Sequence, residues 1–312
     1  MSDPFVHLHF ASGYSMRYGA SSPALLVERA VEHGMDALAL TDRDGTYGAV
    51  KFVQACVSAG VRPILGVDLA VAPSEPPHRS GSSGAGSGAG PGAGAPRRTP
   101  ARGGAFLDDG HPRVTVLARD AGGWAAVCRL VSATHLAGER GQPVTTLALV
   151  ADHLARSDAG VFVLLGPDSD LGRALAVRRP DRAFAALDRW RAVVDPADLC
   201  VEVVHHRGAG DATRAARLLG FAAEVGVPPV LTNAVRYADR GDAPTADVLD
   251  AARRLVALDA RHVDRANAEA CLKSGKEMAE VAEEVARSAG LTDGGRNLLA
   301  RTRAEAERCA VD

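Results

Sequence analysis

Short apolar runs alternate along this chain with longer segments whose apolar residues recur at helical spacing. The short runs predict strands, and the longer segments predict helices. The predicted strands are residues 5–10, 37–40, 62–71, 114–118, 161–165, 199–205 and 229–232. The predicted helices between them are residues 49–59, 124–136, 146–155, 183–194 and 212–225, and one that Ser22 and Pro23 begin and Gly34 ends. This order is typical of an α/β protein with a parallel sheet, here long enough to close into a barrel.

The pattern changes twice along the chain. Residues 73–104 consist mostly of Gly, Ala, Ser and Pro, with too little apolar surface to offset the entropy of ordering. We predict a disordered surface loop there, inserted into the barrel domain. After Asp242 no further strand is evident, and residues 247–257, 276–288 and 298–309 predict helices. We therefore expect a barrel domain over residues 1–250 and a helical tail over residues 251–312.

Composition narrows the function classes. The formal net charge of -2 excludes a stand-alone electrostatic clamp for nucleic acid. The five cysteines are far apart and form no CxxC pair, so neither a disulfide framework nor a cysteine zinc site is indicated. No apolar run reaches the roughly 20 residues of a membrane span, and the first residues lack a secretory signal pattern. We expect a cytoplasmic protein with no membrane partner.

Polar residues follow or interrupt the predicted strands at several points. They are His7, His9, Asp42, Asp68, Glu202, His206 and Asn233. In a barrel, residues at strand ends gather at one rim, and imidazole and carboxylate are ligands of zinc, manganese and iron. Each residue also has a simpler explanation, because an HxH pair is often structural and an aspartate after a strand often caps a helix. From the residues alone, a metal site and a merely polar rim both remain open.

Several segments together resemble one family. HLHFASGYSMRYGA (residues 7–20), GMDALALTDRDGTYGAVKFVQACVSAGVRPILGVDLAV (34–71) and RVTVLARDAGGWAAVCRLVSATHLAG (113–138) are similar to the PHP domain (polymerase and histidinol phosphatase) of bacterial DNA polymerase III alpha subunits. CVEVVHHRG (200–208) and PPVLTNAVRYADRGDAPTADVL (228–249) match two further blocks of that domain. The resemblance implies a distorted (β/α)7 barrel of the PHP type with a C-terminal helical tail.

The tail places the chain within this family. CLKSGKEMAE (271–280) and ERCAVD (307–312) resemble the stretch that joins the domain to the polymerase palm, a stretch that stand-alone PHP phosphatases lack. The resemblance implies the N-terminal module of a DNA polymerase III alpha-like chain, whose palm would follow residue 312. The GAS motif at residues 19–21 and an altered ligand set favour the error-prone type. The parent would be a DNA-directed DNA polymerase.

The resemblance also implies a metal site that is only partly kept. The vestigial metal ligands are His7, His9, Asp42, Asp68, Glu202 and His206. Family ligands are replaced at Ala11, at Tyr18, at Arg43 and in the segment that ends with Arg236. An arginine stays cationic and cannot coordinate a metal. We expect Arg43 and Arg236 to replace the metal by reaching Asp42, Asp68 or Glu202; the alternative is that both arginines point to solvent.

The functional expectation follows from this ligand loss. We predict a structural platform with a degenerate metal site and no cofactor. Its partners would be the remainder of the polymerase chain, DNA through that polymerase, and other replication or translesion subunits. The alternative is a metal-dependent phosphoesterase, such as a proofreading 3′–5′ exonuclease using zinc or manganese. A small-molecule phosphatase is a third possibility, against which the tail argues.

Overall fold

The computed structural model describes residues 5–73, 110–138, 141–154, 160–259 and 265–309. Almost all of the predicted disordered loop, residues 73–104, lies outside these ranges. Within them no helix has both the length and the apolar character that crossing a membrane requires. All five cysteines are free, and only Cys128 is not fully buried.

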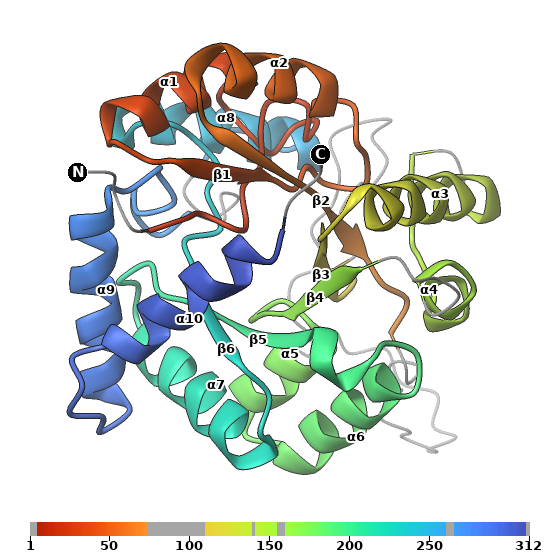
Figure 1. Ribbon diagram of the computed structural model, residues 1–312, viewed down its shortest axis with the longest axis vertical. Coiled ribbons are helices and arrows are strands. Elements are labelled where there is room, and N and C mark those ends of the chain that lie inside the picture. Colours follow the sequence, from red (N-terminus) through yellow and green to blue (C-terminus); the bar gives the residue numbers. More distant parts are fainter. Residues whose placement is uncertain (1–4, 74–109, 139–140, 155–159, 260–264, 310–312) are drawn as a thin grey trace, which may run out of the picture.

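A curled six-stranded sheet forms the centre of the molecule (Figure 1). Its strands, in spatial and sequence order, are β1 (Ala37–Leu40), β2 (Arg62–Ala70), β3 (Arg113–Ala118), β4 (Val161–Leu165), β5 (Leu199–Val204) and β6 (Pro229–Thr232). The pairs β1/β2, β4/β5 and β5/β6 are parallel. The pairs β2/β3 and β3/β4 are antiparallel, so the expectation of a fully parallel sheet is wrong at β3. A parallel neighbour needs a crossover, usually a helix, and the sequence predicts no helix between β2 and β3.

The N-terminal segment closes the barrel without forming a regular strand. Residues 5–10, a predicted strand, are not assigned as one in the structure. Their backbone nevertheless bonds to both sides: Ala39 donates to the His7 carbonyl (3.0 Å), and Val235 donates to the His9 carbonyl (3.1 Å). The segment therefore lies between β1 and the chain that follows β6. These scattered bonds join the two sheet edges, which reduces the unpaired backbone at each edge.

Helices surround the sheet (Figure 1). They are α1 (Pro23–Glu32), α2 (Ala49–Ala59), α3 (Ala121–Ala137), α4 (Leu147–Leu154), α5 (Asp170–Ala176), α6 (Pro180–Arg191), α7 (Asp211–Val225), α8 (Ala243–Arg254), α9 (Gly275–Ser288) and α10 (Arg296–Glu307). The predicted start of α1 is confirmed, because the Ser22 side chain accepts a hydrogen bond from Leu25 N (3.3 Å) and Pro23 is the first helical residue. α5 was not predicted, because its two turns are too short to show a helical period.

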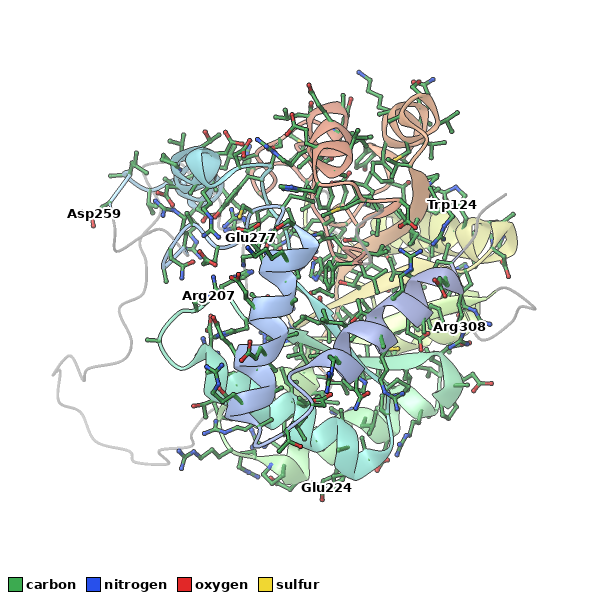
Figure 2. All side chains as sticks on the ribbon, turned by 60° about the vertical axis from the view of Figure 1, so that its left-hand side comes forward. Trp124, Arg207, Glu224, Asp259, Glu277 and Arg308 are labelled. Carbon is green, nitrogen blue, oxygen red and sulfur yellow. The ribbon has the colours of Figure 1, made fainter. Side chains whose placement is uncertain are left out.

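The last two helices pack onto the barrel. α9 contacts α7, and α10 contacts β6 and α9. α9 begins at a capping box in which Ser274 and Glu277 exchange side-chain and backbone hydrogen bonds. Its apolar face, which includes the fully buried Met278 and Val281, joins the main apolar core. Side chains fill the space between helices and sheet (Figure 2). The domain division near residue 250 stays a prediction.

Truncation of Met278 tests how far α9 belongs to the folded core. We expect Met278→Ala to lower the free energy of unfolding by about 2–5 kcal/mol, since it removes a fully buried side chain and leaves a cavity. Urea denaturation monitored by circular dichroism measures this. Lys276→Ala, an exposed position on the same helix, is the control and should change little. Equal stability of the two variants would show that α9 is dispensable for the fold.

Candidate functional site

A cavity of about 800 Å³ opens where the predicted strand ends meet. Six of the eight predicted site residues line it: His9, Arg43, Asp68, Glu202, His206 and Arg236. They come from the N-terminal segment, from β2 and β5, and from the loops after β1, β5 and β6. The expectation that separate segments deliver imidazoles and carboxylates to one rim therefore holds for these six. Their role as metal ligands or metal replacements stays a prediction.

His7 does not line the cavity. Its ring is fully buried, with Nε2 2.8 Å from the carbonyl oxygen of Lys273. Burial lowers the pKa of His7 to about 4, so the ring is neutral at physiological pH. Of the two predicted ligands in the HxH pair, only His9 lines the cavity, because the segment that carries them is not a regular strand. His7 instead anchors the chain that leads into α9.

Asp42 is buried beside the cavity and is fully engaged by hydroxyl and amide donors. Its Oδ1 accepts from Ser12 N (2.7 Å) and from the Ser15 hydroxyl (2.7 Å). The Ser12 hydroxyl also lies within 3.0 Å of both carboxylate oxygens. Burial raises the pKa of Asp42 in spite of these bonds. Neither predicted arginine reaches Asp42 in the structure.

Asp68 is the carboxylate on which two arginines converge. Arg113 Nε donates to its Oδ2 (3.0 Å), and Arg43 Nε lies 3.2 Å from the same oxygen. Burial by itself would raise the pKa of Asp68, but the two guanidinium groups outweigh it and hold the pKa below its usual range. Arg43 thus reaches one of its three expected partners. We missed Arg113, because its approach to Asp68 depends on the antiparallel register of β2 and β3, which the sequence does not reveal.

His9 and Glu202 form a second charged pair in the cavity wall. His9 Nδ1 lies 2.7 Å from Glu202 Oε1, and the Thr232 hydroxyl donates to the same oxygen (2.6 Å). Burial opposes protonation of His9, but the Glu202 carboxylate outweighs it and raises the pKa of the imidazole. Gly166 is required beside this pair, since a Cβ there would meet Glu202 Oε2 at 2.0 Å. The pair is therefore fixed by close packing.

Arg236 pairs with a carboxylate that we did not predict. Its Nη2 and Nη1 donate to the two oxygens of Asp250 on α8 (2.7 and 3.1 Å), and Arg253 Nη2 donates to Asp250 Oδ1 (2.9 Å). Asp250 is fully buried. Burial tends to raise its pKa, but Arg236 and Arg253 outweigh this and lower the pKa. The expected contacts of Arg236 with Asp42, Asp68 or Glu202 are wrong, because α8 packs close enough to the loop after β6 to offer a bidentate partner.

Arg43 and Arg236 both contact the ring of Tyr18. The Arg43 guanidinium lies 3.3 Å from the centroid of the Tyr18 ring, and that of Arg236 lies 4.2 Å from it. Arg236 Nη2 also donates to the Tyr18 carbonyl oxygen (3.1 Å). Cations bind favourably over an aromatic face. Tyr18, Arg43 and Arg236 therefore form one cluster, which links the Asp68 and Asp250 ion pairs.

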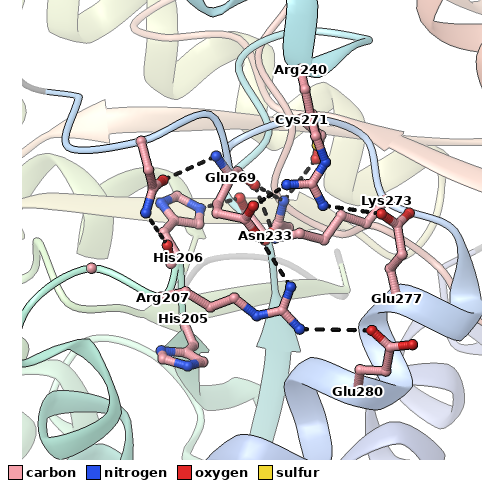
Figure 3. A network of polar contacts seen from close by, with 12 residues as sticks. His205, His206, Arg207, Asn233, Arg240, Glu269, Cys271, Lys273, Glu277 and Glu280 are labelled. Carbon is pink, nitrogen blue, oxygen red and sulfur yellow. Dashed lines mark hydrogen bonds and ion pairs between the residues drawn. The ribbon is translucent and has the colours of Figure 1, made fainter.

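A polar network fixes the opposite side of the cavity (Figure 3). His206 Nε2 lies 2.7 Å from the Asn233 carbonyl oxygen, and burial lowers the pKa of His206. Asn233 donates to the carbonyl of Cys271 (2.7 Å) and accepts from the buried Lys273 Nζ (2.9 Å). Lys273 also pairs with Glu269 (3.2 Å). The segment before α9 is thereby bonded to the ends of β5 and β6.

The donor set does not fit a metal cluster. Within the described ranges, no three or more His, Cys, Asp or Glu side chains are grouped so that they could hold a metal ion. Asp68 is already paired with Arg113 and Arg43, while His7 and His206 each direct Nε2 at a backbone carbonyl. A divalent ion at Asp68 would meet two fixed positive charges.

Comparison with known proteins agrees with the sequence resemblance. The family model described as PHP domain matches residues 7–206. The chain belongs to the PHP domain family. Its barrel is therefore that of a PHP domain.

The similar proteins with full-length sequences are much longer than this PHP domain. An error-prone DNA polymerase of Mycobacterium bovis is 32% identical over 89% of this chain, which covers 23% of that protein. A DNA polymerase III subunit alpha of Saccharopolyspora erythraea is 28% identical over 75% of this chain and 19% of its own length. Among solved structures, an amidohydrolase from Chromobacterium violaceum is 16% identical, with a TM-score of 0.46 over 74% of this chain and 87% of that one. The chain thus spans about a quarter or less of these polymerase relatives.

The Arg113–Asp68 pair predicts a pH-dependent stability difference. We expect Arg113→Gln to cost about 3–5 kcal/mol at neutral pH, because a buried carboxylate loses its main partner. The folded-state pKa of Asp68 is lowered, so the pairing stabilises above the ordinary carboxyl pKa of about 3.9 and is lost as the pH falls through the lower folded-state value. The difference between wild type and variant should therefore narrow below about pH 4.

Denaturant titrations at a series of pH values measure this effect. Arg303→Gln is the control, since the Arg303–Asp36 pair is partly exposed and should contribute about 0–1 kcal/mol after solvent screening. A stability difference for Arg113→Gln that stays constant down to the lowest pH would contradict the assignment to Asp68.

Asp250→Asn tests the second ion-pair centre. Two nearly buried guanidinium groups, those of Arg236 and Arg253, would lose their shared anion, and we expect a loss of about 3–5 kcal/mol in unfolding free energy. Thermal and urea unfolding measure it. Glu283→Gln removes a carboxylate from an exposed pair with Arg287 and should have little effect. An Asp250→Asn variant as stable as Glu283→Gln would refute a structural role for the pair.

Proposed function

We propose that this chain is the PHP module of a DNA polymerase III alpha-like DNA polymerase of the error-prone type, in which it serves as a structural platform with a degenerate metal site. The observation that carries this proposal is the pairing of Asp68 with Arg113 and Arg43. Support for the parent polymerase comes from the polymerase relatives, of whose length the chain covers only a part. Template-directed DNA synthesis would belong to that parent.

The replacement of metal by arginine has a direct physical basis. A buried carboxylate needs a compensating cation, and a guanidinium supplies fixed positive charge together with hydrogen bonds. Unlike a metal ion, it offers no Lewis acidity and no bound water to act as a nucleophile. The barrel mouth can thus keep its architecture while losing the means of hydrolysis.

The bonded network before α9 supports a bracing role. Lys273, Asn233 and His7 hold this segment to the barrel, and Arg240 pairs with Glu277 at the start of α9 (3.1 Å). A rigid tail of this kind suits a module that orients the remainder of a polymerase chain. In this proposal DNA and other replication or translesion subunits are reached through that polymerase, and the cytoplasm is the compartment.

One observation favours the alternative of a metal-dependent phosphoesterase. His9, Asp68 and Glu202 line the same cavity, and they are residue types that bind zinc or manganese. This alternative requires the ion pairs of Asp68 with Arg43 and Arg113 to break. We therefore rank it second.

Metal analysis of the purified chain tests the proposal. We expect substoichiometric zinc and manganese by elemental analysis, and no hydrolysis of a nitrophenyl phosphodiester above that of His9→Ala when manganese or zinc is added. A chain that binds metal stoichiometrically and loses turnover in His9→Ala would be a phosphoesterase.

A gain-of-function variant sharpens this test. The resemblance implies aspartate at positions 18 and 234 and histidine at positions 43 and 236 in metal-binding members. The combined variant Tyr18→Asp, Arg43→His, Ala234→Asp and Arg236→His restores these residues, removes two cations and adds four ligand side chains. Arg29→His, on α1 and outside the cavity lining, is the control. We expect the restored variant to bind more metal than wild type or the control. Equal metal content in all three would show that these positions do not decide metal binding.

A further inference from the structure

We propose that the cavity binds a phosphate group directly through arginine side chains, without a metal ion. The structure brings arginines to it from seven separate places in the chain. Those among its described lining residues are Arg43, Arg113, Arg173, Arg214, Arg236, Arg253, Arg254 and Arg265. The lining carboxylates in the same part of the chain are Asp68, Asp168, Glu202 and Asp211. Several of these arginines pair with carboxylates that do not line the cavity, namely Asp44, Asp247 and Asp250. Guanidinium groups gathered around one hollow are suited to bind the oxygens of a phosphate anion.

Arg43 supplies donors that the protein itself does not use. Its Nε is 3.2 Å from Asp68 Oδ2 but donates no aligned hydrogen bond. Its two terminal nitrogens have no hydrogen-bond acceptor among the residues that the structure describes. The guanidinium is held over the Tyr18 ring at 3.3 Å, and 19% of the side chain is exposed. The planar fork is thus oriented in advance, with its N–H groups available to phosphate oxygens.

Two carboxylates in the cavity wall are already paired with cationic side chains, which reduces their repulsion of an anion. Asp68 accepts from Arg113, and Glu202 accepts from Thr232 and pairs with His9. Only Nδ1 of the His9 imidazole contacts Glu202. Its Nε2 has no hydrogen bond within the described residues. His9 therefore offers a further polar atom in the cavity wall.

The second ion-pair centre places another guanidinium group at the Tyr18 ring. Asp250 is shared by Arg236 and Arg253, which holds both side chains in position. Arg236 lines the cavity and lies over the same aromatic ring as Arg43. Two guanidinium groups fixed by one tyrosine make a preorganised clamp, which costs little further ordering when an anion binds.

The cavity is larger than a phosphate ion alone requires. At about 800 Å³ it falls within the size range of small-molecule sites. A phosphate group could enter as free inorganic phosphate or as the terminal phosphate of a DNA strand. Both share the dianionic phosphate that the arginines would bind, and the experiment below separates them.

The test is calorimetric titration of the whole chain after dialysis against a chelator. The probes are inorganic phosphate, an oligodeoxynucleotide with a terminal phosphate, and the same oligonucleotide with a terminal hydroxyl. We expect inorganic phosphate to bind, and Arg43→Gln to weaken binding by roughly tenfold or more through loss of charge-assisted hydrogen bonds. Arg43→Lys keeps the positive charge opposite Asp68 but loses the planar guanidinium group. We expect its phosphate affinity to lie between those of wild type and Arg43→Gln. Because the charge is kept, this variant also controls for a folding defect.

The matched control is Arg119→Gln. Arg119 also pairs with an aspartate, Asp198, and lies 5.0 Å from an aromatic centroid, that of Phe162. It is not among the residues that line the cavity. Phosphate affinity should therefore be unchanged in this variant. Thermal unfolding of every variant, with and without phosphate, checks that each is folded.

Each outcome decides the proposal. Tighter binding of the phosphorylated oligonucleotide than of inorganic phosphate supports it and assigns the site to a DNA end; the reverse order supports it for a free anion. The proposal is overturned if phosphate does not bind, or if binding requires added zinc or manganese. It is also overturned if Arg43→Gln binds phosphate as tightly as wild type. A fourth contrary result is equal affinity for the two oligonucleotides together with no binding of inorganic phosphate. A chain without metal and without phosphate binding would reject this inference and leave the platform function intact.

Discussion

The buried carboxylate of Asp68 is the constraint on which the barrel mouth depends. A charged oxygen that is removed from water must be matched by a nearby cation, or the folded state loses several kcal/mol. Arg113 and Arg43 supply that match from β3 and from the loop after β1. One ionic requirement therefore fixes the positions of three neighbouring segments around the cavity.

The replacements act together through Tyr18. Its ring contacts both Arg43 and Arg236, each of which is paired with its own carboxylate, Asp68 or Asp250. Because both arginines contact the same ring and each pairs with a buried aspartate, the two ion pairs are linked through Tyr18. This cluster has its own requirements for stability.

The sequence predicted the elements well and their partners poorly. The hydrophobic pattern and the residues typical of helix and strand ends predict the bounds of β1, β4, β6 and α2 as the structure has them. These elements bury continuous apolar faces. Strand direction at β3 and the pairing of Arg236 with Asp250 could not be predicted, since both depend on how distant segments pack. The cavity itself was predictable in outline, because strand ends converge in any barrel. Which of its residues face the cavity, and which, like His7, turn away, depends on backbone detail that periodicity does not encode.

The cavity and the segment before α9 share residues. The proposed phosphate site and the proposed platform role therefore depend on the same part of the chain. Asn267 and Ala270 line the cavity, and Asn267 donates to the His206 carbonyl. Lys273, a few residues further on, is fully buried and bonded to Asn233. A change in the cavity wall therefore acts on the same short segment that leads into α9, through hydrogen bonds and without any large movement. The barrel mouth therefore holds that segment in one position, which the proposed platform for the rest of a polymerase would require.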